Sequence, residues 1–156
     1  MPTTPLDAIA GTTNACQLLP NVVTGGQPGP AQLEAFRAAG GEAVLDLREP
    51  TEARPFDEPA LAASLGLEYT SIPVGPLTMT DETLERITSW LREHEGRSVL
   101  FHCASGNRVG ATALPYLMQE QGMTEEDALQ AAMRAGLRMA DLLHWGLAYA
   151  RGRAQG

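Results

Sequence analysis

The sequence predicts an α/β fold in which a mostly parallel sheet of four to five strands carries helices on both faces. Short β-prone runs alternate with helix-like segments along the chain, which is the pattern of strands joined by helical crossovers. No internal repeat, low-complexity tract or linker divides the 156 residues, and 44% of them are hydrophobic, which is enough for one core. We therefore expect a single domain over residues 1–156, with residues 1–18 as an extended or poorly ordered N-terminal segment.

Four β-prone runs are expected as strands. Turn-forming residues bound them: Gly25-Gly26-Gln27-Pro28 follows the first run, Gly66 precedes the third, and Gly96 precedes the fourth. The predicted strands are residues 21–24, 43–47, 67–72 and 98–103. Sheets of this class bind ligands beyond the carboxyl ends of their strands, and the fourth predicted strand ends at Cys103.

Helix start and stop signals lie between and after these runs. Pro30 opens a helix that Gly40 and Gly41 stop, and Thr80 is a suitable N-cap for a helix with an apolar stripe. The predicted helices are residues 30–37, 59–65, 81–91, 109–121, 124–135 and 139–151. Pro115 lies inside the fourth of these helices and should kink it.

Composition excludes several classes of function. The net charge of -8 leaves no basic stripe for nucleic acid, and no apolar run is long enough to span a membrane. The N-terminus lacks the basic start and apolar stretch of a signal peptide. All eleven basic residues are arginines, which excludes Schiff-base chemistry on lysine. The two cysteines, Cys16 and Cys103, are interpreted as reduced thiols, which predicts a cytoplasmic protein.

The most informative segment is a cysteine and an arginine joined by a short loop that contains glycine. It follows the last predicted strand and precedes a helix, and it reads His102-Cys103-Ala104-Ser105-Gly106-Asn107-Arg108. A strand, a tight loop and a helix N-terminus direct backbone N–H groups and the helix dipole at one point. A thiolate is stabilised there and becomes a usable nucleophile, and a guanidinium is suited to binding an oxyanion.

The residues of this loop have distinct expected roles. We expect Cys103 to be catalytic in preference to being a buried structural thiol, and we expect Arg108 to be catalytic with it. Gly106 is expected at a positive φ angle or at a close approach to a ligand. His102 should point to the opposite face of the strand from Cys103 and brace the loop through a hydrogen bond.

The pattern His102-Cys103-x-x-Gly106-x-Arg108 resembles the signature loop of the cysteine-dependent protein tyrosine and dual-specificity phosphatases. The longer pattern resembles a bacterial branch of that superfamily, the small dual-specificity-phosphatase-like domain that is sometimes fused to a β-lactamase-like hydrolase. The matching segments are residues 24–28, 44–48 with Glu52, 72–74 and 125–129. The resemblance covers roughly residues 20 to 138.

The resemblance implies a fold, a mechanism and a class of substrate. The fold is that of a cysteine phosphatase. Cys103 attacks phosphorus to form a cysteinyl-phosphate, and water then hydrolyses it. The amides of Ala104, Ser105, Gly106, Asn107 and Arg108, together with the Arg108 guanidinium, bind the phosphate oxygens. No metal and no cofactor is required. The substrate is a phosphorylated small molecule or a phosphoprotein, with aryl phosphates preferred.

The chain departs from the pattern of these phosphatases in three ways. Four residues separate Cys103 from Arg108, where five are usual, and Val109 replaces the usual hydroxyl residue after the arginine. Ser105 or Asn107 is a candidate to compensate for that hydroxyl. No carboxylate lies at residues 74–76, where the resemblance places the general acid.

Other side chains are weaker candidates for roles at the site. Asp81, Asp57 and Asp46 are candidate acids, although a helix start is the favoured interpretation of Asp81 and simple solvation that of Asp57. Arg48 either pairs with Glu52 behind the loop or extends the anion pocket.

Two other functions remain open on the sequence. Rhodanese-like sulfurtransferases also carry a cysteine at the head of a short loop, and four intervening residues are characteristic of them. A phosphate-recognition module without turnover would need the same loop.

Overall fold

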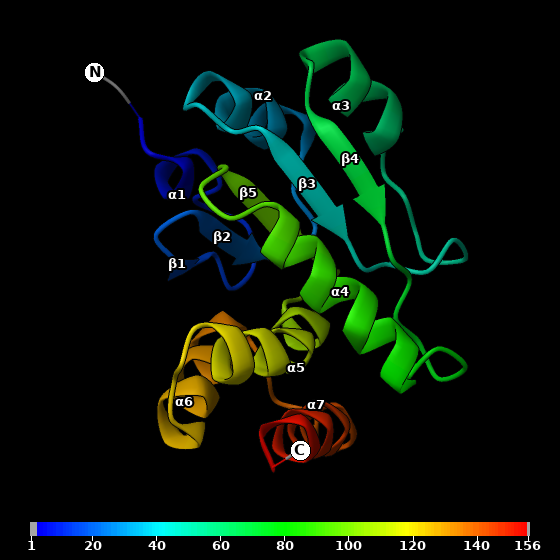
Figure 1. The fold of residues 1–156 in the computed structure, drawn as a ribbon. Helices are drawn as coiled ribbons and strands as arrows, with labels where there is room; N and C mark the ends of the chain where they lie inside the picture. The colour runs from blue at the N-terminus through cyan, green and yellow to red at the C-terminus, as the bar shows by residue number, and fades with distance from the viewer. Residues whose placement is uncertain (1–2, 156) are drawn as a thin grey trace.

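A computed structural model describes residues 3–155 and confirms the predicted α/β class (Figure 1). Five strands form one mostly parallel sheet, in the order β1-β2-β5-β3-β4. The strands are β1 (Cys16–Leu19), β2 (Val22–Gly25), β3 (Ala43–Asp46), β4 (Glu68–Ser71) and β5 (Val99–His102). The helices are α1 (Pro5–Ala8), α2 (Pro30–Ala38), α3 (Glu58–Leu65), α4 (Asp81–Glu93), α5 (Asn107–Pro115), the π-helical segment η1 (Tyr116–Glu120), α6 (Glu125–Ala135) and α7 (Ala140–Gln155).

The register of the sheet brings four strand ends to one edge. β5 pairs in parallel with β2 on one side and with β3 on the other, so that His102 lies opposite both Gly25 and Asp46. β4 continues the parallel part beyond β3, and β1 alone is antiparallel, along the far side of β2. The segments that follow β2, β3, β4 and β5 therefore leave the sheet at the same edge, which Figure 1 shows as the side to which the arrows point.

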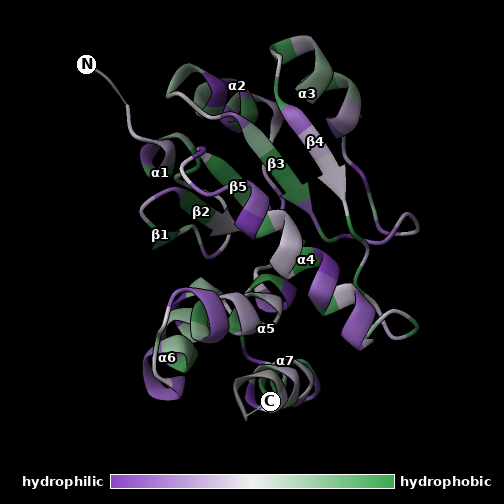
Figure 2. Cartoon of the chain, viewed as in Figure 1, coloured by the Kyte–Doolittle hydropathy of each residue, from purple (hydrophilic) through white to green (hydrophobic). Residues whose placement is uncertain are grey.

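Side chains of the central strands alternate between two hydrophobic layers. Leu45 and Phe101 pack with α4, α5, α6 and α7 on one face, while Val44 and Leu100 pack with α1, α2 and α3 on the other. Because β2, β3 and β5 are buried along their whole length, apolar residues occupy both faces of these strands (Figure 2). In the described part of the chain, no helix has the length and apolar character needed to cross a membrane.

The N-terminal segment differs from the prediction that residues 1–18 are extended or poorly ordered. Residues 1 and 2 lie outside the described part, but α1 begins at Pro5 and β1 at Cys16. Thr4 and Asp7 cap α1 reciprocally, and Ile9 just after it is fully buried against α2. β1 forms because the edge of β2 supplies hydrogen-bond partners, a tertiary effect that its four residues do not reveal.

The helix after the loop also differs in detail. The helix begins at Asn107, two residues before the predicted start, and its α-helical part ends at Pro115. The next turn is π-helical, with the Gln121 amide donating to the Tyr116 carbonyl five residues earlier. Pro115 lacks an amide hydrogen, so the helix changes its hydrogen-bond pattern at the residue where a kink was predicted.

Candidate active site

The loop between β5 and α5 is held by hydrogen bonds that its carbonyl groups accept from neighbouring segments. The Ala104 carbonyl accepts from the Gln27 amide at 3.0 Å, and the Ser105 carbonyl accepts from the Asn14 side chain at 2.7 Å. A Cβ on Gly26 would collide with the Ala104 carbonyl, so the Gly25-Gly26-Gln27 turn after β2 must lack a side chain at that point. With the carbonyls turned outward, the amides of the loop are left to face the other way.

On the inner side, the loop closes around the cysteine. The Gly106 amide donates to Cys103 Sγ at 3.0 Å, and the Cys103 side chain has no exposed surface. Gly106 has φ +103°, and a Cβ there would collide with the Ala135 carbonyl of α6. The expectation of a positive φ angle at Gly106 is therefore confirmed, and only glycine meets both requirements.

Arg108 is clamped by a carboxylate from a distant loop. Its guanidinium donates to both carboxylate oxygens of Glu52, at 2.6 and 2.8 Å, and to the Val74 carbonyl at 3.1 Å. The Glu52 hydrogen bond raises the pKa of Arg108, to which the nearby Cys103 side chain contributes, and the same pair lowers the pKa of Glu52. The guanidinium is thus fixed in charge and in orientation.

Arg48 pairs with carboxylates other than Glu52. Its side chain is only 2% exposed, and it lines a hollow of about 570 Å³ beside Ala104 of the loop. Its guanidinium instead donates to Asp46 at 2.7 Å, to Glu58 at 3.2 Å and to the side chain of Gln27. The expected pair with Glu52 does not form, because Asp46 and Glu58 supply the carboxylate partners of Arg48, while a role of Arg48 in the anion pocket stays a prediction.

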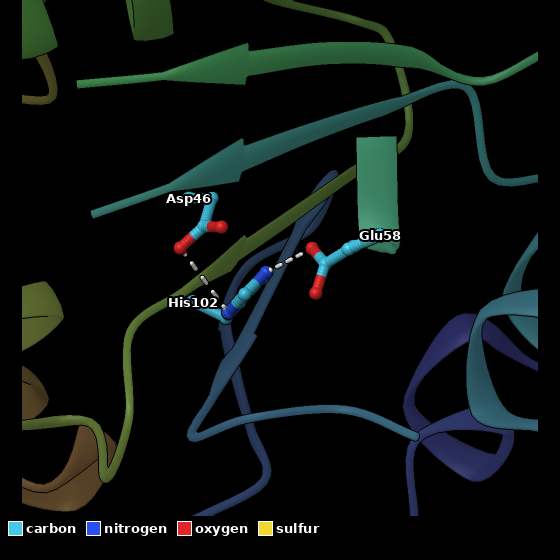
Figure 3. Close-up of side chains that lie close together, drawn as sticks. All are labelled: Asp46, Glu58 and His102. Carbon is cyan, nitrogen blue, oxygen red and sulfur yellow. Dashed lines mark hydrogen bonds and ion pairs between the residues drawn. The ribbon is translucent and has the colours of Figure 1, made fainter. Parts of the chain in front are cut away.

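His102 lies in a fully buried cluster behind the loop (Figure 3). Its Nε2 lies 2.5 Å from Glu58 Oε2, and its Nδ1 lies 3.2 Å from the Cys103 carbonyl oxygen and 3.9 Å from Asp46 Oδ1. The imidazole therefore links helix α3 and strand β3 to the backbone of the loop. This is the position that a bracing side chain requires.

Asp46 is the most strongly perturbed acid of this cluster. Burial alone would raise its pKa, but hydrogen bonds from Arg48 and Tyr69 and the nearby His102 lower it to about 2. The Tyr69 hydroxyl donates to Asp46 Oδ2 at 2.5 Å, and burial, together with this hydrogen bond, raises the pKa of Tyr69. An ionised, fully buried carboxylate has no proton to donate, which excludes Asp46 as the general acid.

Asp46, Glu58 and His102 are also residue types that bind metals, and one atom of each lies within 4.8 Å of the others. The protein's own cation already occupies this place, because Arg48 contacts both carboxylates. A divalent ion would have to displace that guanidinium from a site that is closed to solvent. The cluster is therefore an internal ion network that supports the loop.

The loop opens on its other side into a cavity of about 440 Å³. Its walls come from the turn after β3, the segment after β4, the loop itself and the start of α7. The lining residues are Glu49, Glu52, Val74, Gly75, Pro76, Met79, Ser105, Asn107, Arg108, Met139, Asp141 and Leu142. The cavity lies at the carboxyl edge of the parallel strands, next to the arginine of the loop.

None of the three candidate acids lines this cavity. Asp57 is exposed and caps helix α3 by accepting from the Ala60 amide at 3.1 Å. Asp81 is exposed at the start of α4 and faces a different hollow, beside Trp145. Two carboxylates that the sequence did not single out, Glu49 and Asp141, do line it. Both come from segments adjacent to the site only in three dimensions, so no local motif could mark them.

Asn107 and Ser105 differ in what they can offer. Asn107 Oδ1 accepts from the amides of Arg138 and Met139, at 2.6 and 3.0 Å, and so ties the loop to the connection between α6 and α7. Ser105 lines the cavity and is exposed. Both residues line the cavity, but Asn107 uses its Oδ1 to hold the loop, whereas Ser105 is the more exposed of the two.

Comparison with known proteins identifies the fold. No protein-family model matches the sequence, and no curated protein matches it. Among solved structures, a candidate phosphatase (DUF442) from Shewanella putrefaciens CN-32 aligns with TM-score 0.80 at 24% identity, covering 95% of this chain and 97% of that one. Tk-PTP in its active form aligns with TM-score 0.76 at 25% identity, covering 90% and 97%.

A third neighbour, P. aeruginosa TpbA, aligns with TM-score 0.68 at 22% identity, covering 90% of this chain and 84% of that chain. These neighbours have the folds of cysteine-dependent tyrosine and dual-specificity phosphatases, and this chain has the same fold, as the resemblance implied.

Proposed function

We propose that this chain is a phosphomonoesterase that uses Cys103 as its nucleophile and Arg108 to bind the phosphate. The observation that carries the proposal is the convergence of three groups at one loop: the Cys103 thiol, the Gly106 amide that donates to it, and a guanidinium held by Glu52 beside an open cavity. The similarity to the phosphatases described above supports the proposal, since the alignments with their structures cover nearly the whole of this chain.

The reaction has two steps. Cys103 Sγ attacks phosphorus as the ester oxygen leaves, which forms a cysteinyl-phosphate, and water then releases inorganic phosphate and restores the thiol. Arg108 and the amides of residues 104–108 bind the phosphoryl oxygens as negative charge develops on them. Because these groups supply the positive field, we propose that the reaction needs no metal.

Access to the thiol sets a condition on this mechanism. Cys103 has no exposed surface, whereas the Arg108 side chain is 17% exposed. An incoming phosphate therefore meets Arg108 first and reaches Sγ only as the loop widens around it.

We propose aryl phosphates as the preferred substrates. The rim of the cavity is apolar beside the arginine, where Val74, Pro76, Met79, Met139 and Leu142 lie. An aromatic ring can pack there while its phosphate enters the loop. TpbA has been solved in complex with pTyr, which supports this class of substrate, whereas PTPMT1 has been solved in complex with PI(5)P.

Hydrolysis of p-nitrophenyl phosphate in the presence of EDTA tests the proposal. The wild-type chain should release p-nitrophenol, Cys103→Ser should abolish release, and Cys16→Ser should retain it because Cys16 lies on β1, away from the loop. Mass spectrometry of an acid-quenched reaction should detect a phosphate on Cys103. A fully active Cys103→Ser variant would refute the mechanism.

The same protein samples separate the two other functions. Formation of thiocyanate from thiosulfate and cyanide, without phosphate release, would instead identify a sulfurtransferase. Calorimetric binding of inorganic phosphate without any turnover would identify a recognition module. Either result replaces the proposal.

A further inference from the structure

The space beside residues 74–76 holds a carboxyl group that these residues do not themselves supply. Residues 74–76, just after β4, contain no acid, and Gly75 stands in the middle of them. A Cβ on Gly75 would collide with the carboxyl group of Glu49, which shows that the Glu49 side chain fills the space next to this glycine. Both residues line the cavity that also holds Arg108. The chain thus presents an acid on this wall of the cavity from a different loop.

The backbone of Glu49 is fixed by the same residue that fixes Arg108. The Glu49 amide donates to Glu52 Oε2 at 2.6 Å, and the Glu49 carbonyl accepts from the Glu52 amide at 3.1 Å and from the Arg54 side chain at 3.2 Å. Because Glu52 also holds the Arg108 guanidinium, the position of Glu49 is set relative to the group that binds phosphate.

The other two carboxylates of the cavity are less suited to donate a proton. Both oxygens of Glu52 accept from Arg108, which lowers the pKa of Glu52 and keeps it ionised. Asp141 is exposed in the first turn of α7, where a negative charge stabilises the helix. Glu49 is partly buried, and within residues 3–155 its carboxyl group has no hydrogen-bond or ion-pair partner.

We propose that Glu49 is the general acid of the reaction, an inference that rests on the proposed phosphatase function. In the first step the Sγ–P bond forms, the P–O bond to the leaving group breaks, and the proton of the Glu49 carboxyl group passes to the leaving oxygen. In the second step the Glu49 carboxylate takes a proton from the attacking water, the water oxygen bonds to phosphorus, the S–P bond breaks with the electron pair left on Sγ, and phosphate is released. Thiolate and protonated Glu49 are both restored.

Dependence on the leaving group tests this role. Glu49→Gln should lower kcat/KM for phenyl phosphate by about 10²–10⁴-fold, because phenolate leaves poorly without a proton. For p-nitrophenyl phosphate, whose phenolate is a good leaving group, the loss should be less than about tenfold. Asp81→Asn is the matched control, since Asp81 lies outside the cavity, and it should keep the wild-type ratio of the two substrates.

Gly75→Ala provides a second variant that retains the carboxyl group. The new methyl group should displace Glu49 and produce the same selective loss with phenyl phosphate, and the double variant should be no worse than Glu49→Gln alone. If Glu49→Gln folds poorly, as judged by thermal unfolding, Gly75→Ala decides the question.

The outcomes distinguish this proposal from the proposed function. If the wild type cleaves both substrates and Glu49→Gln keeps their ratio, or if Asp141→Asn shows the selective loss instead, Glu49 is not the acid while the phosphatase function stands. If the wild type cleaves neither substrate, the proposed function itself fails.

Discussion

Replacing Asp46 by asparagine should destabilise the protein and change how its stability depends on pH. Asp46 is fully buried, contacts Arg48 at 2.7 Å and accepts from the Tyr69 hydroxyl at 2.5 Å. The variant keeps the shape of the side chain and removes its charge. Arg48 then retains Glu58 as its only carboxylate partner in the described chain.

The magnitude follows from the pKa of Asp46, which is about 2 in the folded protein against an ordinary value of 3.8. At about 1.36 kcal/mol per pKa unit, the ionised form contributes about 2 kcal/mol of stability at neutral pH. Since the folded pKa is lowered, this contribution is complete well above pH 3.8 and is lost as the pH falls towards 2; about half is gone at pH 3. Breaking the buried ion pair should cost about 3–5 kcal/mol in total at pH 7.

Urea unfolding followed by circular dichroism between pH 6 and pH 3 measures this effect. The free-energy difference between the wild type and Asp46→Asn should be largest near pH 6 and smaller by about 1 kcal/mol at pH 3. Asp57→Asn controls for the loss of one negative charge, because Asp57 is an exposed N-cap and asparagine caps equally well. A difference that stays constant over this range would refute the assignment of Asp46 as an ionised partner of Arg48.

Two further changes test the loop itself. Gly106→Ala should lower the free energy of unfolding by at least about 1–2 kcal/mol and abolish phosphatase activity, because a positive φ and the Ala135 carbonyl both exclude a Cβ; Gly122→Ala, also at positive φ but with no atom near, should cost only the backbone strain. Thermal unfolding and p-nitrophenyl phosphate hydrolysis measure both. Glu52→Gln should reduce kcat/KM by about 10²-fold by freeing Arg108, yet change the unfolding free energy by only about 1 kcal/mol, since the pair is partly exposed. An unchanged rate would mean that Glu52 does not orient Arg108.

Much of the fold could be predicted from local patterns. The runs around Val44 and Leu100 are apolar on both faces, which is typical of central parallel strands, and glycine, proline and threonine mark the ends of several helices. β1 was missed because a four-residue edge strand depends on its partner rather than on its own sequence. Pro115 predicted an irregularity in its helix, but the sequence did not show that the following turn is π-helical.

Some parts of the candidate site could likewise be predicted from the sequence, and others could not. Cys103, Gly106 and Arg108 lie within six residues of one another, so a single loop carries their relation and the sequence shows it. Glu52 was expected to pair with Arg48, because a partner nearby in the sequence is easier to infer than Arg108, which lies 56 positions away. Asp57 and Asp81 were reasonable acids by type, and the structure uses both at helix starts.

The sequence by itself determined the class of fold, the loop between Cys103 and Arg108, and the kind of chemistry that such a loop supports. These features depend on local spacing, turn residues and hydrophobic periodicity, which act over a few residues. Only the tertiary structure decided which carboxylate holds Arg108, that Asp46 and Arg48 are buried partners behind the loop, and that Glu49 fills the space beside Gly75. Those relations arise where parallel strands end at one edge, because the sheet brings together loops that are far apart in the chain.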